Sequence, residues 1–523
     1  MSYRKNGTLL ATTLLFSFIL FSSCSNFLSP EPESFTSKSQ SLQTPGDFEA
    51  ILNGAYNRLR EQAPISEWES MYMLEIRADA INRQFNVNLP FGDRQGQQME
   101  EWTMTTANQG VLNQWTKIYD TIQQTNTILQ NIDNTQFEDQ NQKSRIKGEA
   151  KFIRALSYWY AVQYWGDVPL ILNEVSSRED AIPDEGRTSV DEVYSQIISD
   201  LQEAISELPK SAAQPGRADE GAARFLLGRT YLLTEDYSSA IELLESVTSN
   251  FNYTLLPNYE NIWDPSNTNN NESIFELQFS NNIASQPSAD LISKILPHNS
   301  TGEIVTSQVN ALGWYHPSHE LFNMINEDDE RLKANIKWWE KSGNNRFPDV
   351  SLAGDSIAII NKFFWPNSIT EEGEQAGNVI LFRYSDALLS LAEAYWRDNP
   401  SENEGEVLNL INQVRARAGL PEVDLNNVPV PDILDGTFLE NDPLGRALFI
   451  ERSIELFAEG HRFFDLKRFG DDFALTVMRN YADSRKEREP RLQGVMNIQS
   501  HKLLFPIPGS EANLAGLQQN SGW

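Results

Sequence analysis

The sequence is poor in cysteine, in basic residues and in long apolar runs. Cys24 is the only cysteine in 523 residues, so the chain cannot form an internal disulfide. Lys and Arg number 42 against 73 Asp and Glu, which gives a net charge of −31. Nucleic acids need a basic surface that releases their counterions, so we do not expect nucleic acid as a partner. Beyond residue 23 no stretch is apolar enough for a transmembrane helix of about 20 residues.

Motifs for nucleotide and metal chemistry are also missing. No Gly-rich loop precedes Lys-Ser/Thr, and no Gly-x-Gly-x-x-Gly follows a strand. His316 and His319 lie three apart beside Glu320, but Pro317 disfavours the helix that would align them, so we expect a solvated loop or helix cap. Asp328–Arg331 lacks the donor spacing and turn glycine of a calcium loop and is expected to be a surface turn. We predict no metal and no cofactor.

The N-terminus has the pattern of an export signal. Arg4 and Lys5 precede Leu9–Phe21, an apolar run that is too short to span a bilayer. Small residues then precede Cys24, as in a bacterial lipobox, and a free thiol would be unusual in an exported protein. We therefore predict a signal peptide at 1–23, a lipidated Cys24 and a tether at 24–46, with the folded domain beginning near residue 47.

Most of the remaining sequence has helical periodicity. Helices or helix pairs are expected at 50–61, 112–132, 144–165, 190–208, 222–247, 384–398, 406–419 and 446–470. Two of them, 144–165 and 384–398, are apolar almost all round, which is typical of helices buried between others. Trp115, Trp159, Trp165 and Trp396 lie within helical periods and are expected in the core.

One stretch has the pattern of a tetratricopeptide helix hairpin. Between residues 222 and 247, Leu227, Gly228, Tyr231, Ala240 and Leu244 have the required spacing, in which small residues let two helices approach. Neighbouring helices repeat the small-residue pattern without a fixed period. We predict a mostly α, tetratricopeptide-like scaffold at about 47–250 and 379–470.

Residues 251–378 differ from this scaffold. They are rich in Asn, Ser, Pro and Gly, with few helical periods and a strand expected at SIFELQF. Long irregular loops on a rigid frame often carry binding sites, so we predict that this loop-rich part, with a few short strands, binds the ligand.

Five motifs, in order, resemble one family. KFIRALSYWYAVQYWGDVPLIL, VILFRYSDALLSLAEAYW, LINQVRARAGLP, IERSIELFAEGHRFFDLKRFG and the terminal KLLFPIPGSEANLAGLQQNSGW are similar to the SusD/RagB outer-membrane lipoproteins of Bacteroidetes, as is CSNFLSPEP after the lipobox. The likeness spans the mature chain, with a family motif at 500–523. In EGHRFFDLKRFG we expect Phe463 and Phe464 in the core, Gly460 at the end of a turn, and Arg462 paired locally with Asp465.

The resemblance implies a surface glycan-binding lipoprotein of the outer membrane. It would capture oligo- or polysaccharide and pass it to a SusC-like TonB-dependent transporter, without cleaving it. RagB-like members serve peptide uptake instead, and that alternative stays open. A surface hydrolase is less favoured, but no pattern distinguishes a catalytic carboxylate pair among the 73 acidic side chains.

A glycan site needs aromatic platforms beside polar side chains that bond to hydroxyls. Aromatic residues in polar, turn-rich context are the candidates, together with polar neighbours of Phe91. They are Trp68, Tyr72, Phe91, Trp314, Tyr315 and Trp365, with Asn88, Asp93 and Arg94 as hydrogen-bonding partners. The net charge favours a neutral glycan mildly, because salt screens the repulsion of an anionic one.

Overall fold

The computed structural model describes residues 42–62, 71–83, 94–177, 186–279, 295, 315–340, 356–365 and 377–523. The predicted signal peptide and Cys24 lie outside them. The longer helices are α3 (Pro45–Gln62), α6 (Gln109–Asn131), α7 (Gln140–Trp165), α8 (Val190–Glu207), α9 (Glu220–Leu233), α10 (Tyr237–Asn250), α14 (Tyr384–Asp398), α15 (Glu404–Arg417), α16 (Pro443–Glu455) and α18 (Asp471–Arg488).

The remaining elements are short. The helices are α5 (Arg94–Glu100), α12 (His319–Met324), α13 (Arg331–Asn335), α17 (Arg462–Arg468) and α19 (Gly509–Ala515). Single turns are the π-helix η1 (Tyr72–Ile76) and the 3-10 helices η2 (Ile132–Asn134), η4 (Tyr259–Ile262), η6 (Asp432–Leu434), η7 (Phe438–Glu440), η8 (Pro490–Leu492) and η9 (Ser500–Leu503). The strands are β1 (Ile81–Arg83), β2 (Ser273–Leu277), β3 (Tyr315–Pro317), β4 (Ile336–Glu340), β5 (Ser356–Ile360) and β6 (Val379–Arg383).

Every helix predicted from periodicity is present, and the mostly α fold class is confirmed. Local sequence explains where several helices begin. Ser189 and Glu192 form a capping box at α8, and Asp236 caps α10 by accepting from the Ser239 N–H. α7 is buried almost continuously, as its all-round apolar sequence predicts, and the four tryptophans expected in the core are buried.

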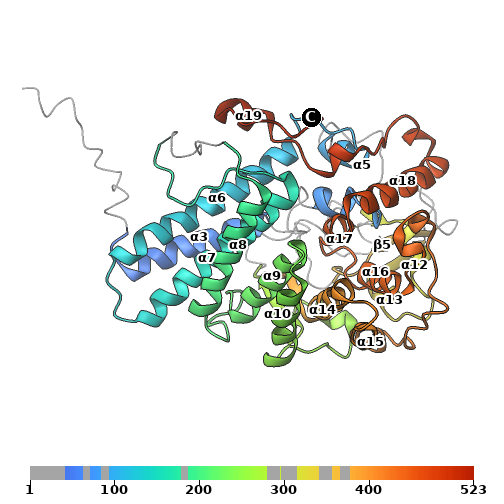
Figure 1. The fold of residues 1–523 in the computed structure, drawn as a ribbon, viewed down its shortest axis with the longest axis horizontal. Coiled ribbons are helices and arrows are strands. Elements are labelled where there is room, and N and C mark those ends of the chain that lie inside the picture. The colour runs from blue at the N-terminus through green and yellow to red at the C-terminus, as the bar shows by residue number, and fades with distance from the viewer. Residues whose placement is uncertain are drawn as a thin grey trace, which may run out of the picture.

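The helices stack into a continuous array. α3, α6, α7 and α8 lie side by side at one end of the molecule, followed by α9 and α10, and α14 to α18 occupy the other end (Figure 1). α10 packs directly against α14, although residues 251–383 separate them in the chain. The two parts of the predicted scaffold therefore form one array.

The predicted tetratricopeptide hairpin is α9 and α10. A Cβ atom placed on Gly228 would lie 2.8 Å from Leu244 Cγ, so glycine sets the close approach of the two helices. Ala240 and Leu244 are buried on the facing side of α10. The small-residue spacing in the sequence thus corresponds to real helix contact.

Three antiparallel strand pairs lie beside the array: β1 with β3, β2 with β6, and β4 with β5. In the second pair, Ser273 lies opposite Arg383 and Leu277 opposite Val379. β6 ends where α14 begins, so residues 278–378 leave and rejoin the scaffold at one place. This pair allows α10 to meet α14.

Candidate functional site

The short ladder of β1 and β3 gathers the predicted ligand-binding segments. Arg83, the last residue of β1, lies opposite Tyr315, the first residue of β3. Residues 84–93 therefore leave the ladder at the same end where residues 296–314 enter it. Phe91 and Asp93 belong to the first segment and Trp314 to the second.

Other candidates belong to elements around this ladder. Tyr72 begins η1 and the exposed Arg94 begins α5, and these two elements pack on each other and on β1. β5 packs on β3, and the half-buried Trp365 follows β5 by five residues. Candidates from three distant parts of the sequence are thus attached to one group of elements.

The described residues cover only part of the predicted site. Trp68, Asn88, Phe91, Asp93 and Trp314 lie outside them, so their roles stay predictions. Tyr315 is described and is only 1% exposed. A buried ring offers no open face to a sugar, so Tyr315 belongs to the core and the platform predicted for it is wrong.

Polar contacts hold the ladder against α5 and α18. The Arg83 N–H donates to Glu100 Oε1 at 3.2 Å, and the Arg485 guanidinium lies 2.8 Å from the same oxygen. Burial would raise the pKa of Glu100, but Arg485, Arg491 and Arg83 hold it below its ordinary value. Glu100 is therefore ionised, and its contacts hold β1 against α5 and α18.

The predicted solvated loop at His316 is wrong. His316 is buried in β3 opposite Asn82, and burial together with Arg485 lowers its pKa to about 4. His319 is the first residue of α12 and follows the N-cap Ser318, so the alternative prediction of a helix cap is confirmed there. Within the described ranges, no group of three or more His, Cys, Asp and Glu is placed to hold a metal ion.

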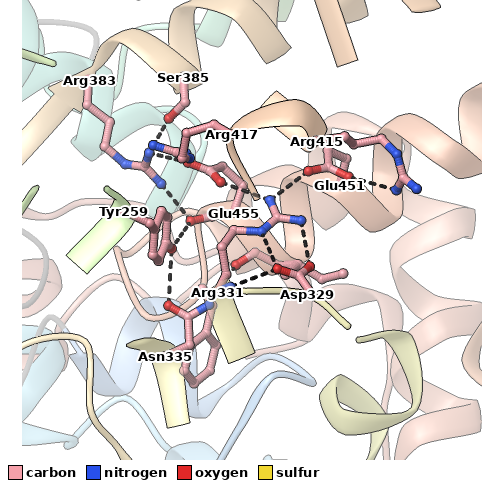
Figure 2. A network of polar contacts seen from close by, with 12 residues as sticks. Tyr259, Asp329, Arg331, Asn335, Arg383, Ser385, Arg415, Arg417, Glu451 and Glu455 are labelled. Atoms are coloured by element: carbon pink, nitrogen blue, oxygen red, sulfur yellow. Dashed lines mark hydrogen bonds and ion pairs between the residues drawn. The ribbon is translucent and has the colours of Figure 1, made fainter. Parts of the chain in front are cut away.

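A buried ionic network, here named the ionic hub, joins the loop-rich part to the scaffold (Figure 2). Its cations are Arg331, Lys362, Arg383, Arg415 and Arg417, and its carboxylates are Glu272, Asp329, Glu451, Glu455 and Glu459. The five positive charges balance the five negative ones. All of these side chains except Arg415 are nearly inaccessible to solvent.

Arg383 at the end of β6 is central to the ionic hub. Its guanidinium contacts Glu459 through Nε at 2.6 Å and through Nη2 at 2.8 Å, and its Nη1 reaches Glu272 at 3.0 Å and also contacts Glu455. Burial would lower the pKa of Arg383, but Glu459 and Glu455 hold it well above its ordinary value. Burial would raise the pKa of Glu455, yet the surrounding arginines hold it well below its ordinary value.

Arg331 connects the ionic hub to the middle of the loop-rich part. It binds Asp329 with Nε at 3.0 Å and Nη2 at 2.8 Å, and its Nη1 reaches Glu451 at 2.6 Å and Glu455 at 2.9 Å. The surface turn predicted at 328–331 is confirmed for Asp328 and Glu330, which are exposed, and is wrong for Asp329 and Arg331, which are buried. The error arises because the partners of Arg331 in α16 lie 120 and 124 residues away in the sequence.

A second buried network corrects the pairing predicted around residue 462. Arg462 binds Asp79 at 2.6 and 2.7 Å rather than Asp465. Asp465 instead accepts from Arg452, at 3.0 and 3.1 Å, and from Arg468 at 2.8 Å. Phe463 and Phe464 are in the core as predicted, and Gly460 has a positive φ of 83°.

Glu75 is a carboxyl group whose pKa lies near neutrality, although its side chain has no access to solvent. Burial raises the pKa of Glu75 in η1 to about 8, although Gly460 N–H donates to its Oε1 at 2.6 Å. A raised carboxyl pKa in a cleft would be a feature of a general acid. Glu75 is fully buried and cannot reach a substrate, so this residue is structural.

The described residues form a helical-repeat scaffold with three short antiparallel strand pairs beside it. Two family models match the chain. That of the SusD family matches residues 353–523, and one described as starch-binding and associating with the outer membrane matches residues 27–232.

Relatives match most of the chain. A SusD-like protein of Formosa agariphila is 25% identical over 494 residues, covering 87% of this chain and 89% of that protein. The starch-binding protein SusD of Bacteroides thetaiotaomicron is 23% identical over 460 residues, covering 75% of each. A solved laminarin-binding SusD-like protein shares the fold, with a TM-score of 0.71, 24% identity, and coverage of 92% of this chain and 100% of that one. The chain belongs to the SusD/RagB family.

Proposed function

We propose that this protein binds glycans at the cell surface. It captures oligo- or polysaccharide through aromatic loops around the β1–β3 ladder and delivers it to a SusC-like TonB-dependent transporter in the outer membrane. It does not cleave the ligand. Lipidation at Cys24, which follows the export-signal pattern, is its membrane anchor. None of the helices described is long and apolar enough to cross a bilayer.

The convergence of distant candidate segments on the β1–β3 ladder supports this proposal most directly. Stacking on a sugar requires rings held at fixed positions. Arg83 and Tyr315, from which the segments of Phe91 and Trp314 continue, are paired across the ladder, which supports a shared location for the two segments. The names of the starch-binding and laminarin-binding relatives support the same ligand class.

Residues 25–523 test the proposal in a calorimetric screen against neutral polysaccharides, acidic polysaccharides and a peptide mixture. We expect one polysaccharide to bind and to remain uncleaved in chromatography of the reaction products. Trp314→Ala should weaken that binding by about 1–3 kcal/mol. Phe438→Ala is the matched control, because Phe438 is an aromatic residue in η7, away from the β1–β3 ladder, and is 48% exposed.

Other outcomes separate the alternatives. Binding of peptides without glycans would favour the RagB-like function, and release of reducing ends would favour a hydrolase. Equal effects of Trp314→Ala and Phe438→Ala would contradict the proposed site while leaving the ligand class intact. The Cys24→Ala variant of the full-length precursor should lose its membrane association on cell fractionation.

A further inference from the structure

Arg77 is a buried cation that has no polar partner. It directly follows η1, and its side chain is fully inaccessible to solvent. None of its three guanidinium nitrogens, Nε, Nη1 and Nη2, has a hydrogen-bond partner among the described residues. Buried polar groups in folded proteins are nearly always hydrogen-bonded, and buried charges are nearly always paired. An unpaired guanidinium in the interior therefore indicates a ligand of opposite charge.

The other arginines at this depth differ from Arg77. Arg331, Arg383, Arg452 and Arg485 are also among the fully buried side chains, and each lies within 3.0 Å of a carboxylate oxygen. Burial lowers the pKa of Arg77 well below its ordinary value, and no described carboxylate offsets this shift. The chain therefore balances its other fully buried arginines with its own acidic residues, but not this one.

The two acidic residues nearest to Arg77 in the sequence contact other groups. Asp79 binds Arg462 at 2.6 and 2.7 Å. Glu75 accepts from the Gly460 N–H, and its pKa of about 8 leaves it mostly protonated at neutral pH. Neither of them supplies the negative charge that would balance Arg77.

Three aromatic rings surround the Arg77 guanidinium. Its Cζ lies 4.7 Å from the ring centroid of Trp102, 4.6 Å from that of Phe463 and 4.0 Å from that of Phe505. A desolvated cation–π contact contributes about 2 kcal/mol, but a ring face is a poor acceptor for an N–H donor. The rings therefore hold the guanidinium in place without satisfying its hydrogen-bonding capacity.

Two lysines lie beside these rings. Lys502 Nζ donates to the Trp102 carbonyl at 2.5 Å, and Lys467 Nζ donates to the Gln163 carbonyl at 2.9 Å. Lys467 is one turn beyond Phe463 on α17, so the two residues lie on the same face of that helix. Both lysines are half-buried, whereas Arg77 has no access to solvent.

The charges of these three cations act on one another. Burial and the charge of Arg77 lower the pKa of Lys502. Burial also lowers the pKa of Lys467 to about 8, and Arg77 adds to this shift while Asp471 opposes it. Within the described part of the chain, neither lysine is in ion-pair contact with a carboxylate. Three positive charges thus share one region of a chain whose net charge is −31.

We propose that Arg77, Lys467 and Lys502 form an anion site that binds a free tetrahedral oxyanion, sulfate or phosphate. The lysines form its outer side and Arg77 its inner end. A guanidinium offers paired N–H donors to such an ion, and each ammonium keeps two donors beyond its carbonyl bond. A doubly charged ion neutralises more of the three positive charges than chloride or water does. Because Arg77 is inaccessible, a free ion suits the site better than a sulfate ester on a polymer.

Calorimetric titration of residues 25–523 with sodium sulfate, sodium phosphate and sodium chloride, in buffers of equal ionic strength, tests this site. We expect sulfate or phosphate to bind at one site per chain, and chloride to give no saturable heat. Lys502→Gln and Lys467→Gln should each reduce the affinity about tenfold, the effect of losing one charged hydrogen bond. Arg77→Met retains an apolar side chain of similar length and should abolish binding.

Lys147→Gln is the matched control, because Lys147 pairs with Asp133 at 3.1 Å near the opposite end of α7 from Gln163, and it should leave the affinity unchanged. Crystals soaked in sodium selenate would locate the ion even if Arg77→Met failed to fold. The anomalous signal of selenium should lie within hydrogen-bond distance of the Arg77 guanidinium. Selenate found only elsewhere, or equal affinities of Lys502→Gln and Lys147→Gln, would overturn the proposal.

A sulfated carrageenan oligosaccharide distinguishes a free ion from a sulfate ester. It should not displace bound sulfate or phosphate from the wild-type protein, and displacement would overturn the assignment to a free ion. This site uses none of the aromatic candidates, so its failure would leave the proposed glycan capture at the β1–β3 loops intact.

Discussion

Arg383 offers the sharpest test of how the loop-rich part is held to the scaffold. Arg383→Met would remove one of five positive charges from the ionic hub and leave Glu272, Glu455 and Glu459 short of a partner. Breaking a buried ion pair by removing one partner costs about 3–5 kcal/mol. Whole domains are stable by only about 5–15 kcal/mol, so this loss would be a large fraction of the total.

Equilibrium urea unfolding, followed by tryptophan fluorescence, would measure the loss. Arg415→Gln is the matched control, because Arg415 is 22% exposed and lies 3.4 Å from Glu451, and it should cost less than about 1 kcal/mol. Adding Glu459→Gln to Arg383→Met restores the charge balance and should recover part of the loss. A cost for Arg383→Met no larger than that for Arg415→Gln would refute this account of the ionic hub.

Two further variants probe packing and buried ionisation. Gly228→Ala should lower stability by about 1–3 kcal/mol in urea unfolding, because its Cβ would press on Leu244, whereas Gly405→Ala on α15 meets no atom within 4 Å and should not destabilise. Glu75 has a folded pKa of about 8 against an ordinary 4.5, so the folded state binds its proton more tightly and wild-type stability falls as pH rises between these values. Glu75→Gln can keep the bond from Gly460 N–H and should flatten this part of the calorimetric melting profile between pH 5 and 8; an unchanged slope would contradict the assignment.

Periodicity predicted the helices well, because each depends mainly on its own apolar spacing. The helix α18 was missed, since charged residues at both ends of DDFALTVMRNYADSRKER interrupt its apolar pattern. Its buried face, which includes Phe473, Leu475 and Tyr481, is defined by the residues that cover it rather than by local sequence.

The burial and the partners of charged residues were predicted less well than the burial of apolar residues. Asp329 and Arg331 have the local sequence of a turn, yet both are buried, because Arg331 binds Glu451 and Glu455 of α16 and Asp329 accepts from Arg331. Arg462 has an acidic residue three positions away and pairs instead with Asp79, 383 residues away. Local spacing does not reveal such partners. The one available signal is the presence of four charged residues among the apolar residues of α16, namely Arg446, Glu451, Arg452 and Glu455.

Most of the candidate site stays a prediction. Sequence placed aromatic candidates in polar segments, and the β1–β3 register pairs Arg83 with Tyr315, from which two of these segments continue. The prediction for Tyr315 was wrong because a polar, turn-rich local sequence does not show that all three residues of β3 are buried by contacts with distant parts of the chain.

The β2–β6 pair has a consequence for how such proteins diverge. Because residues 278–378 leave and return at paired strands, their length can change without moving α10 from α14. Doubling a flexible loop costs only about 0.6 kcal/mol in closure entropy. Insertions, deletions and substitutions can therefore accumulate in this segment, while the ion pairs of Arg331 and Lys362 keep its interior attached to the scaffold. Proteins that bind different ligands can then arise by changes within this segment while the helical scaffold stays the same. This fits a family whose members keep one fold at about 25% identity.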